Sequence, residues 1–249
     1  MDYQKYIGVD GCKAGWFFVG IHSNGECEFG VFKTLAELWL ANQKDALILV
    51  DIPIGLPSKT TPSRECDTRA RKLLSPLRHG SVFTPPCRET LSAQNYEEAC
   101  RVNESVLGKK PSIMAWNITG KIREADNLLL ENPEACNGLR ESHPEVCFCM
   151  LNSGNPMEHY KKKPEGQTER LELLQGLFDT SRAIFKAAKD RFLRREVAED
   201  DFVDALVLAA TGYLSKGELS TLPDKPPFDK QSLPMEMVYF MKRRTVGMP

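Results

Sequence analysis

Four aspartates stand where the carboxylates of a folded chain can meet. Asp10 follows the apolar residues 6–9, and Asp51 follows the apolar run 46–50. Asp201 and Asp204 are three residues apart near the start of a predicted helix, so they share one of its faces. Sites that transfer phosphoryl groups with two metals need several converging carboxylates, because the cations lie about 3.5–4 Å apart. The pattern predicts that Asp10, Asp51 and Asp204 hold two Mg²⁺ or Mn²⁺ ions, with Asp10 between them, for the hydrolysis of phosphodiesters.

The helix start has a second interpretation. Asp200 or Asp201 can serve as the N-cap, because acidic residues are favoured in the first turn. Asp204 lies within an otherwise apolar run, where an unpaired charge would be costly, so it requires a metal or a salt bridge. Asp201 is kept as a candidate catalytic residue beside the three predicted ligands.

Two further acid–base candidates follow a predicted short strand over residues 138–142. Pro144 should end that strand, which would leave Glu145 at its carboxyl end, where it could orient water or add a metal ligand. His143 is a candidate for substrate contact and proton transfer, and the alternative is a structural role beside the proline.

The elements that must position these residues begin with three strands over 6–10, 15–21 and 27–32. A helix over 34–42 follows, in which Thr34 and Glu37 form a predicted capping box, and then a buried strand over 46–51. This βββαβ order predicts an α/β fold with a five-stranded mixed sheet covered by helices on both faces. The strands that carry Asp10 and Asp51 are then neighbours. Later helices are expected over 168–178, 181–194 and 200–214, and an edge strand over 237–241.

The stretch of about 57–137 differs in composition from the flanking segments, with many prolines and short helices predicted over 63–74, 96–107 and 118–132. We predict a largely helical insertion that covers the site, within one domain over residues 1–249. Its arginines Arg64, Arg71 and Arg78 are candidates for binding substrate phosphate, because a guanidinium fork matches two phosphate oxygens. The alternative is that Arg64 and Arg71 pair with Asp67 along a helix.

Composition limits the class of protein. With 41% hydrophobic and 27% charged residues, the chain can build a sizeable core, which excludes a disordered protein. Its 33 basic and 34 acidic residues leave a net charge of -1, which counts against a protein that binds duplex DNA tightly. The three consecutive lysines at 161–163 are interpreted as a solvated face. Apolar runs too short for a bilayer and the lack of a secretory signal pattern predict a cytoplasmic protein without membrane contact. The sequence indicates no protein partner.

Six motifs between residues 7 and 206 together resemble the domain of unknown function 429, a family predicted to consist of RNase H-like nucleases. They are Ile7-Gly8-Val9-Asp10-Gly11-Cys12-Lys13-Ala14-Gly15-Trp16, Asp51-Ile52-Pro53-Ile54-Gly55-Leu56-Pro57, Arg64-x-Cys66-Asp67-x-x-Ala70-Arg71, Ser81-Val82-Phe83-x-x-Pro86, His143-Pro144-Glu145-x-x-Phe148 and Asp201-x-x-Asp204-Ala205-Leu206.

The resemblance implies an RNase H-like fold and, more distantly, a similarity to the Holliday-junction resolvases. It implies metal ligation by Asp10, Asp51 and Asp204, with Asp201 adjoining, and a nucleic acid or nucleotide phosphoester as substrate. Glu145 belongs to the family's own motif, and Asp51 is shorter than the glutamate usual in resolvases.

Two other classes stay open at this point. A nucleotide-binding module of the actin or sugar-kinase type also opens with a strand ending in Asp-Gly, but the sequence carries no later glycine-rich phosphate loop. A non-catalytic protein that binds nucleic acid or another ligand on the same fold is the second alternative.

Overall fold

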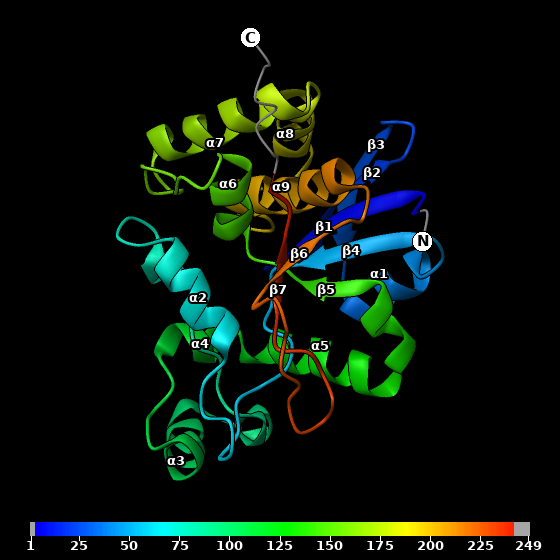
Figure 1. Ribbon diagram of the computed structural model, residues 1–249. Coiled ribbons are helices and arrows are strands. Elements are labelled where there is room, and N and C mark those ends of the chain that lie inside the picture. Colours follow the sequence, from blue (N-terminus) through cyan, green and yellow to red (C-terminus); the bar gives the residue numbers. More distant parts are fainter. Residues whose placement is uncertain (1–2, 242–249) are drawn as a thin grey trace.

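A five-stranded mixed β-sheet forms the centre of the protein, which we describe from a computed structural model over residues 3–241 (Figure 1). The spatial order of its strands is β3-β2-β1-β4-β5. An antiparallel meander consists of β1 (Lys5–Cys12), β2 (Gly15–His22) and β3 (Cys27–Phe32), and β4 (Ala46–Val50) and β5 (Leu139–Glu141) continue the sheet in parallel with β1. The predicted α/β class and mixed five-stranded sheet are confirmed.

The helix α1 (Leu35–Asn42) joins β3 to β4, and its start is as predicted. Thr34 Oγ1 accepts a hydrogen bond from the backbone N–H of Glu37 at 3.1 Å. The Glu37 carboxylate accepts in return from the Thr34 N–H at 3.4 Å. This reciprocal capping box fixes the point at which the chain turns back toward the sheet.

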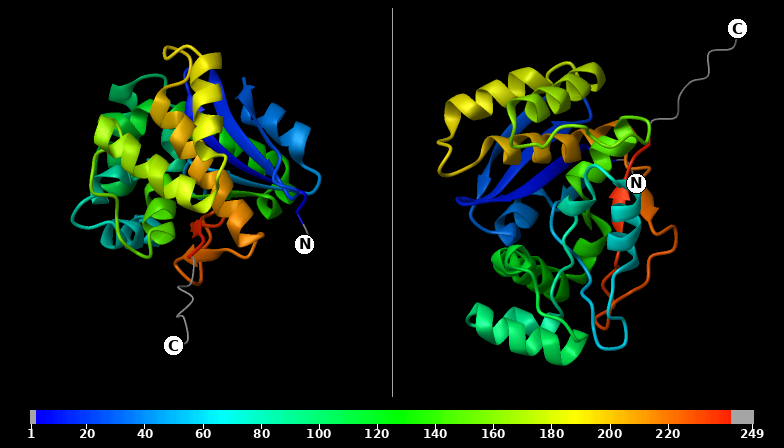
Figure 2. Two further views of the ribbon diagram at one scale, coloured as in Figure 1. Left: turned by 90° about the horizontal axis from the view of Figure 1, so that it is seen from above. Right: turned by 90° about the vertical axis from the view of Figure 1, so that its left-hand side faces the viewer.

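Alternate residues of the central strands enter two different hydrophobic cores. Tyr6 and Leu49 belong to the core beneath one set of helices, whereas Ile7 and Val50 belong to the core on the opposite face. The first face is covered by α6 (Pro144–Leu151), α7 (Pro164–Leu177), α8 (Ser181–Arg191) and α9 (Glu199–Ser215). The second is covered by α1 and α5 (Thr119–Glu131), and Figure 2 shows α7, α8 and α9 together on one side of the strands.

The helix α9 lies unusually close to β1 because β1 has a glycine at the contact. A Cβ atom added to Gly8 would lie 2.0 Å from the carbonyl oxygen of Ala205 and 2.3 Å from the backbone nitrogen of Ala209. Two small helix residues, Ala205 and Ala209, therefore face a strand residue without a side chain. This contact sets the height of α9 above the strand that carries Asp10.

The chain between β4 and β5 is largely helical. It contains α2 (Glu65–Leu73), α3 (Tyr96–Leu107), α4 (Ile113–Asn117) and α5, with 3₁₀ turns at His79–Ser81, Arg88–Ser92 and Pro133–Asn137. The helices predicted over 63–74, 96–107 and 118–132 are confirmed as α2, α3 and α5, whereas α4 and α6 were not predicted. In Figure 1, α2, α3 and α4 lie beyond the carboxyl end of β4, while α5 packs on the sheet.

The last described residues return to the edge of the sheet. A two-stranded antiparallel ribbon consists of β6 (Ser220–Leu222) and β7 (Met237–Tyr239), which confirms part of the edge strand predicted over 237–241. An isolated β-bridge between Ser142 and Val238 connects this ribbon to the five-stranded sheet beside β5. The loop between β6 and β7 also reaches the segment after β4, where the Leu56 N–H donates to Asp229 Oδ2 at 2.9 Å.

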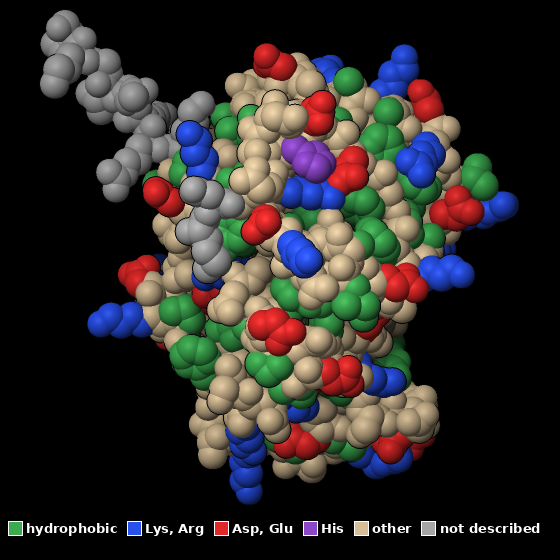
Figure 3. Space-filling view, turned by 90° about the vertical axis from the view of Figure 1, so that its right-hand side faces the viewer, with side chains coloured by type: hydrophobic (Ala, Val, Ile, Leu, Met, Phe, Trp, Pro, Cys, Tyr) green, Lys and Arg blue, Asp and Glu red, His purple; other side chains and the backbone are tan. Residues whose placement is uncertain are grey.

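Basic and acidic side chains are interspersed on the face drawn in Figure 3, in keeping with the near-neutral net charge. Among residues 3–241, no helix combines the length and the apolar composition needed to cross a bilayer.

Candidate active site

Strand register brings Asp10 and Asp51 together on the face covered by α9. In the parallel pair of β1 and β4, Val9 lies opposite Val50, so the next residue of each chain is Asp10 and Asp51. Both valines point into the core on the opposite face. Because successive side chains alternate across a strand, the two aspartates point toward α9. Asp10 lies within β1 rather than at its end as expected, since β1 continues to Cys12 and pairs there with β2.

Asp204 completes this cluster from the helix side. It lies one turn into α9, and its side chain is 1% exposed. One carboxylate oxygen each from Asp10, Asp51 and Asp204 lie within 4.8 Å of one another. Oxygen ligands about 2.1 Å from one Mg²⁺ ion lie up to about 4.2 Å apart, so this spacing is close to that of a single coordination sphere. The three residues predicted as ligands are thus brought together.

The environment of these carboxylates disfavours their negative charge. Burial raises the pKa of Asp10 well above its usual value, and the nearby carboxylates of Asp51 and Asp204 raise it further. Burial likewise raises the pKa of Asp51, while His143 acts in the opposite direction. The cluster therefore has an excess of negative charge, which a divalent cation would offset. The donor set and this excess of negative charge both fit Mg²⁺ or Mn²⁺.

One lysine already reaches the cluster. Lys161 Nζ donates a short hydrogen bond to Asp204 Oδ2 and lies 3.9 Å from Asp200 Oδ2. Burial alone would lower the pKa of Lys161, but the carboxylates of Asp204 and Asp10 outweigh it and raise that pKa. The interpretation of residues 161–163 as a solvated face is wrong for Lys161, whose side chain is 29% exposed, although Lys162 beside it is 61% exposed.

Asp201 holds the start of the helix that carries Asp204. Its Oδ2 accepts a hydrogen bond from the Ala198 N–H at 2.8 Å, at the N-terminus of α9. Burial and the neighbouring carboxylates of Asp200 and Asp204 raise the pKa of Asp201 to about 6, against the effect of this hydrogen bond. The N-cap is therefore Ala198 and neither Asp200 nor Asp201 as expected; Asp201 is the third residue of α9, and it contributes negative charge near Asp10 while its carboxylate is held by the backbone.

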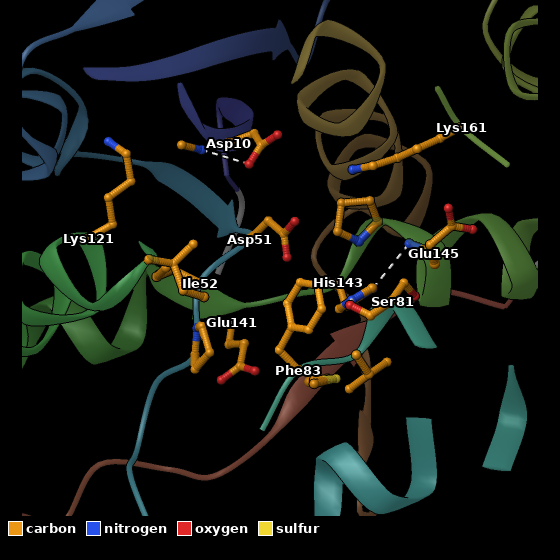
Figure 4. Close-up of a pocket in the computed structure, with 16 residues that line it drawn as sticks. Asp10, Asp51, Ile52, Ser81, Phe83, Lys121, Glu141, His143, Glu145 and Lys161 are labelled. Atoms are coloured by element: carbon orange, nitrogen blue, oxygen red, sulfur yellow. Dashed lines mark hydrogen bonds between the residues drawn. The ribbon is translucent and has the colours of Figure 1, made fainter. Parts of the chain in front are cut away.

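A pocket of about 170 Å³ opens next to Asp10 and Asp51 (Figure 4). One side of it is polar and includes these aspartates, His143 and Lys161. The other side is apolar and is formed largely by Ile52, Pro53, Val82, Phe83, Ile118 and Met237. A ligand in this pocket can place a charged group against the aspartates and an apolar group against Phe83. Residues of the segment 57–137 line it, so that segment borders the site as predicted.

Glu145 also lines the pocket, but its carboxylate is paired with an arginine. Arg170 donates to Glu145 Oε1 at 2.6 Å, and both side chains are buried. Figure 4 shows the Glu145 carboxylate directed away from Asp51. The expected strand end is wrong, because β5 ends at Glu141 and Glu145 lies in the first turn of α6. Its Oε2 is buried without a hydrogen-bond partner among the described residues, so one oxygen stays available to a ligand.

His143 joins the pocket to its surrounding loops. Its Nδ1 accepts a hydrogen bond from the Glu145 N–H at 3.2 Å and so caps α6. Its Nε2 lies 3.3 Å from the Ser81 carbonyl oxygen, which assigns the ring proton to Nε2. Both ring nitrogens thus contact backbone groups of the protein, which favours the structural role given as the alternative for His143. The ring still lines the pocket beside Asp51.

The structure does not support Arg64 as a phosphate-binding residue. Its side chain is buried, with one guanidinium nitrogen 3.3 Å from Asp67 Oδ1 and another in a short ion pair with Glu141 Oε2. Burial raises the pKa of Glu141 to about 8 even though Arg64 opposes this. Cys66, Asp67 and Glu141 also lie within 4.8 Å of one another, but the charge of Arg64 already compensates this group.

Arg71 and Arg78 also bind protein atoms rather than lining the pocket. Arg71 donates to the Val82 carbonyl oxygen at 3.1 Å and to Thr84 Oγ1 at 2.6 Å, which holds the segment that carries Phe83. Arg78 donates to the Glu158 carbonyl oxygen at 3.0 Å. The expected pairing of Arg71 with Asp67 is replaced by these bonds, so the arginines organise the walls of the site.

Two lysines supply the positive charge that sequence reasoning assigned to the arginines. Lys121 donates to the Gly15 carbonyl oxygen at 2.6 Å, and its Nζ lies 4.2 Å from the centre of a Trp16 ring. Burial lowers the pKa of Lys121, and it lines the pocket together with Lys161. Neither position stands out in the sequence, because their approach depends on how α5 and the loop before α7 fold back onto β1 and α9.

A family model described as "Protein of unknown function (DUF429)" matches residues 8–227. No curated protein and no solved structure matches the chain.

Proposed function

Because the chain belongs to the DUF429 family, whose function is unknown, we propose a function from the site itself: metal-dependent hydrolysis of a phosphodiester, as in a nuclease of RNase H-like type. The observation that carries this proposal is the convergence of Asp10, Asp51 and Asp204 within 4.8 Å. The strand order β3-β2-β1-β4-β5 with α9 across β1 supports an RNase H-like fold.

The residues of the chain have separate roles in this proposal. Asp10, Asp51 and Asp204 would hold Mg²⁺ or Mn²⁺, which lowers the pKa of a water molecule and stabilises charge on phosphate oxygens. Asp201 holds the start of α9, so it positions Asp204. Glu145 is paired with Arg170 and directed away from Asp51, so in this proposal it holds the wall of the pocket and does not orient the attacking water.

The pocket favours a single nucleotide unit over a duplex. Its apolar side presents Phe83 and Ile52, which can receive a base, while the aspartates lie on its other side. The net charge of -1 is unlike the strongly basic balance of a duplex binder. We therefore propose a single-stranded nucleic acid, a flipped nucleotide or a small nucleotide phosphoester as substrate. As a separate proposal, the protein is placed in the cytoplasm.

The proposal is tested by hydrolysis of bis-p-nitrophenyl phosphate and of labelled single-stranded DNA and RNA with Mg²⁺ or Mn²⁺. Asp10→Asn should lower the rate by more than about 100-fold, since loss of a ligand should exceed the effect of losing an outer-shell partner. Asp190→Asn, which changes an exposed carboxylate on α8, should retain the wild-type rate. Activity that needs no metal, or that survives in Asp10→Asn, would overturn the proposal.

A further inference from the structure

Lys161 lies among the carboxylates of the site, in contact with Asp204 and near Asp200. It lies in the loop between α6 and α7, and its side chain turns toward α9 rather than toward solvent (Figure 4). Its Nζ is bonded to Asp204 Oδ2 and lines the same pocket as Asp10 and Asp51. Lys162, the next residue, points outward and lies 3.8 Å from Asp200 Oδ2. The inward position is therefore particular to Lys161.

The charges at the site can be counted. Asp10, Asp51 and Asp204 carry three negative charges when ionised, and Lys161 neutralises one of them. Asp201 and Lys121, the neighbouring charged groups that act on Asp10 or on each other, carry opposite charges and offset one another. The two negative charges that remain are balanced by one divalent cation. A second divalent cation would leave an excess of positive charge at a site where Asp204 is buried and Asp10 and Asp51 are half-buried, and such an imbalance is costly there.

The geometry of Asp204 leads to the same result. A carboxylate that bridges or completes a second metal needs a free oxygen, but Asp204 Oδ2 is already occupied by the lysine. Its other oxygen takes no part in the ion pair with Lys161, and we assign that oxygen to a cation shared with Asp10 and Asp51. An ammonium has three N–H donors, so Lys161 can bind Asp204 with one and still offer donors to the pocket.

We propose that Lys161 replaces the second metal, so that the site binds one divalent cation and the lysine provides the other positive charge for a phosphate oxygen. This inference rests on the proposed metal-dependent hydrolysis. In that reaction the water oxygen forms a bond to phosphorus, the ester bond to the leaving oxygen breaks, and the leaving oxygen takes up the proton that water loses. Lys161 keeps its protons throughout and acts by its charge alone.

The number of bound Mn²⁺ ions per chain, counted by equilibrium dialysis with electron paramagnetic resonance, tests the inference. The wild type should bind one ion. Lys161→Met removes the charge at similar length and should bind two ions. Lys161→Arg keeps the charge and should bind one. Lys162→Met is the matched control, because it removes an exposed lysine from the same loop, and it should bind one ion as well.

Each outcome has a distinct meaning. Two ions in the wild type, or one ion in both the wild type and Lys161→Met, would overturn the role of Lys161 and leave the proposed hydrolysis intact. No bound ion in the wild type would overturn both. Circular dichroism reports whether Lys161→Met folds. If it does not fold, the numbers of Mn²⁺ ions bound by the wild type and by Lys161→Arg still test the inference.

Discussion

The substitution Gly8→Ala should displace the helix that brings Asp204 to the site. A Cβ at this position would lie 2.0 Å from the Ala205 carbonyl oxygen, whereas ordinary contacts of a Cβ begin at 3.4 Å. The helix α9 must therefore retreat from β1 by about 1.4 Å, because backbone atoms cannot rotate away as a side chain can. Asp204 moves with the helix, away from Asp10.

Both the stability and the metal affinity should change. Overpacking of this kind costs about 1–3 kcal/mol in the free energy of unfolding. A displacement of more than 1 Å at one of three ligands should weaken Mn²⁺ binding by about 100-fold, the order of the loss that misplacement of 1 Å causes in active sites. Urea unfolding followed by circular dichroism measures the first quantity, and calorimetry measures the second.

Gly176→Ala is the matched control. Gly176 lies in α7, and a Cβ added there has no atom within 4 Å. This variant should be more stable than the wild type by about 0.4–1 kcal/mol, because alanine restricts the unfolded chain. Its Mn²⁺ affinity should be unchanged. If Gly8→Ala were as stable as Gly176→Ala and bound Mn²⁺ like the wild type, the contact between α9 and β1 would not set the geometry of the site.

Three further predictions concern the charged groups. Mn²⁺ affinity should fall by about tenfold or more from pH 7.5 to pH 5.5, because the pKa values of Asp10 and Asp51 are raised and protons compete with the metal; calorimetry at both pH values measures this, and equal affinities would contradict it. For the same reason the metal-free protein should lose stability as pH rises above about 4, since the folded state holds protons that the unfolded chain releases. Arg170→Met should lower the free energy of unfolding in urea by about 3–5 kcal/mol, because it leaves Glu145 buried without its partner. The exposed pair of Arg182 and Glu172 provides the control, in which Arg182→Met should cost about 0–1 kcal/mol, and equal losses in the two variants would contradict the buried pair's importance.

The core of the site was predictable because it depends on local order and register. A βββαβ sequence places β1 beside β4, and strand alternation then directs Asp10 and Asp51 to one face. Asp204 was predictable because a carboxylate inside an apolar helical run needs a partner. These inferences use only spacing and hydrophobic pattern, which the sequence contains.

The remaining parts depend on contacts between distant segments. Residues 146–151 are apolar throughout, so no periodicity distinguished α6 from a strand, and the position of Glu145 was wrong for that reason. Arg64 is held by Glu141, 77 residues away, and Lys161 is held by Asp204, 43 residues away. Such long-range pairings determine whether a lysine or arginine side chain faces a substrate or a buried carboxylate. A run of basic residues in the sequence does not reveal these pairings.

The central claim is that Asp10, Asp51 and Asp204 hold a divalent cation, and crystals grown with Mn²⁺ test it most directly. An anomalous peak about 2.0–2.3 Å from an oxygen of each aspartate, absent from crystals of Asp10→Asn, is the predicted result. A peak at Cys66, Asp67 and Glu141 instead, or no peak at saturating Mn²⁺, would contradict the account.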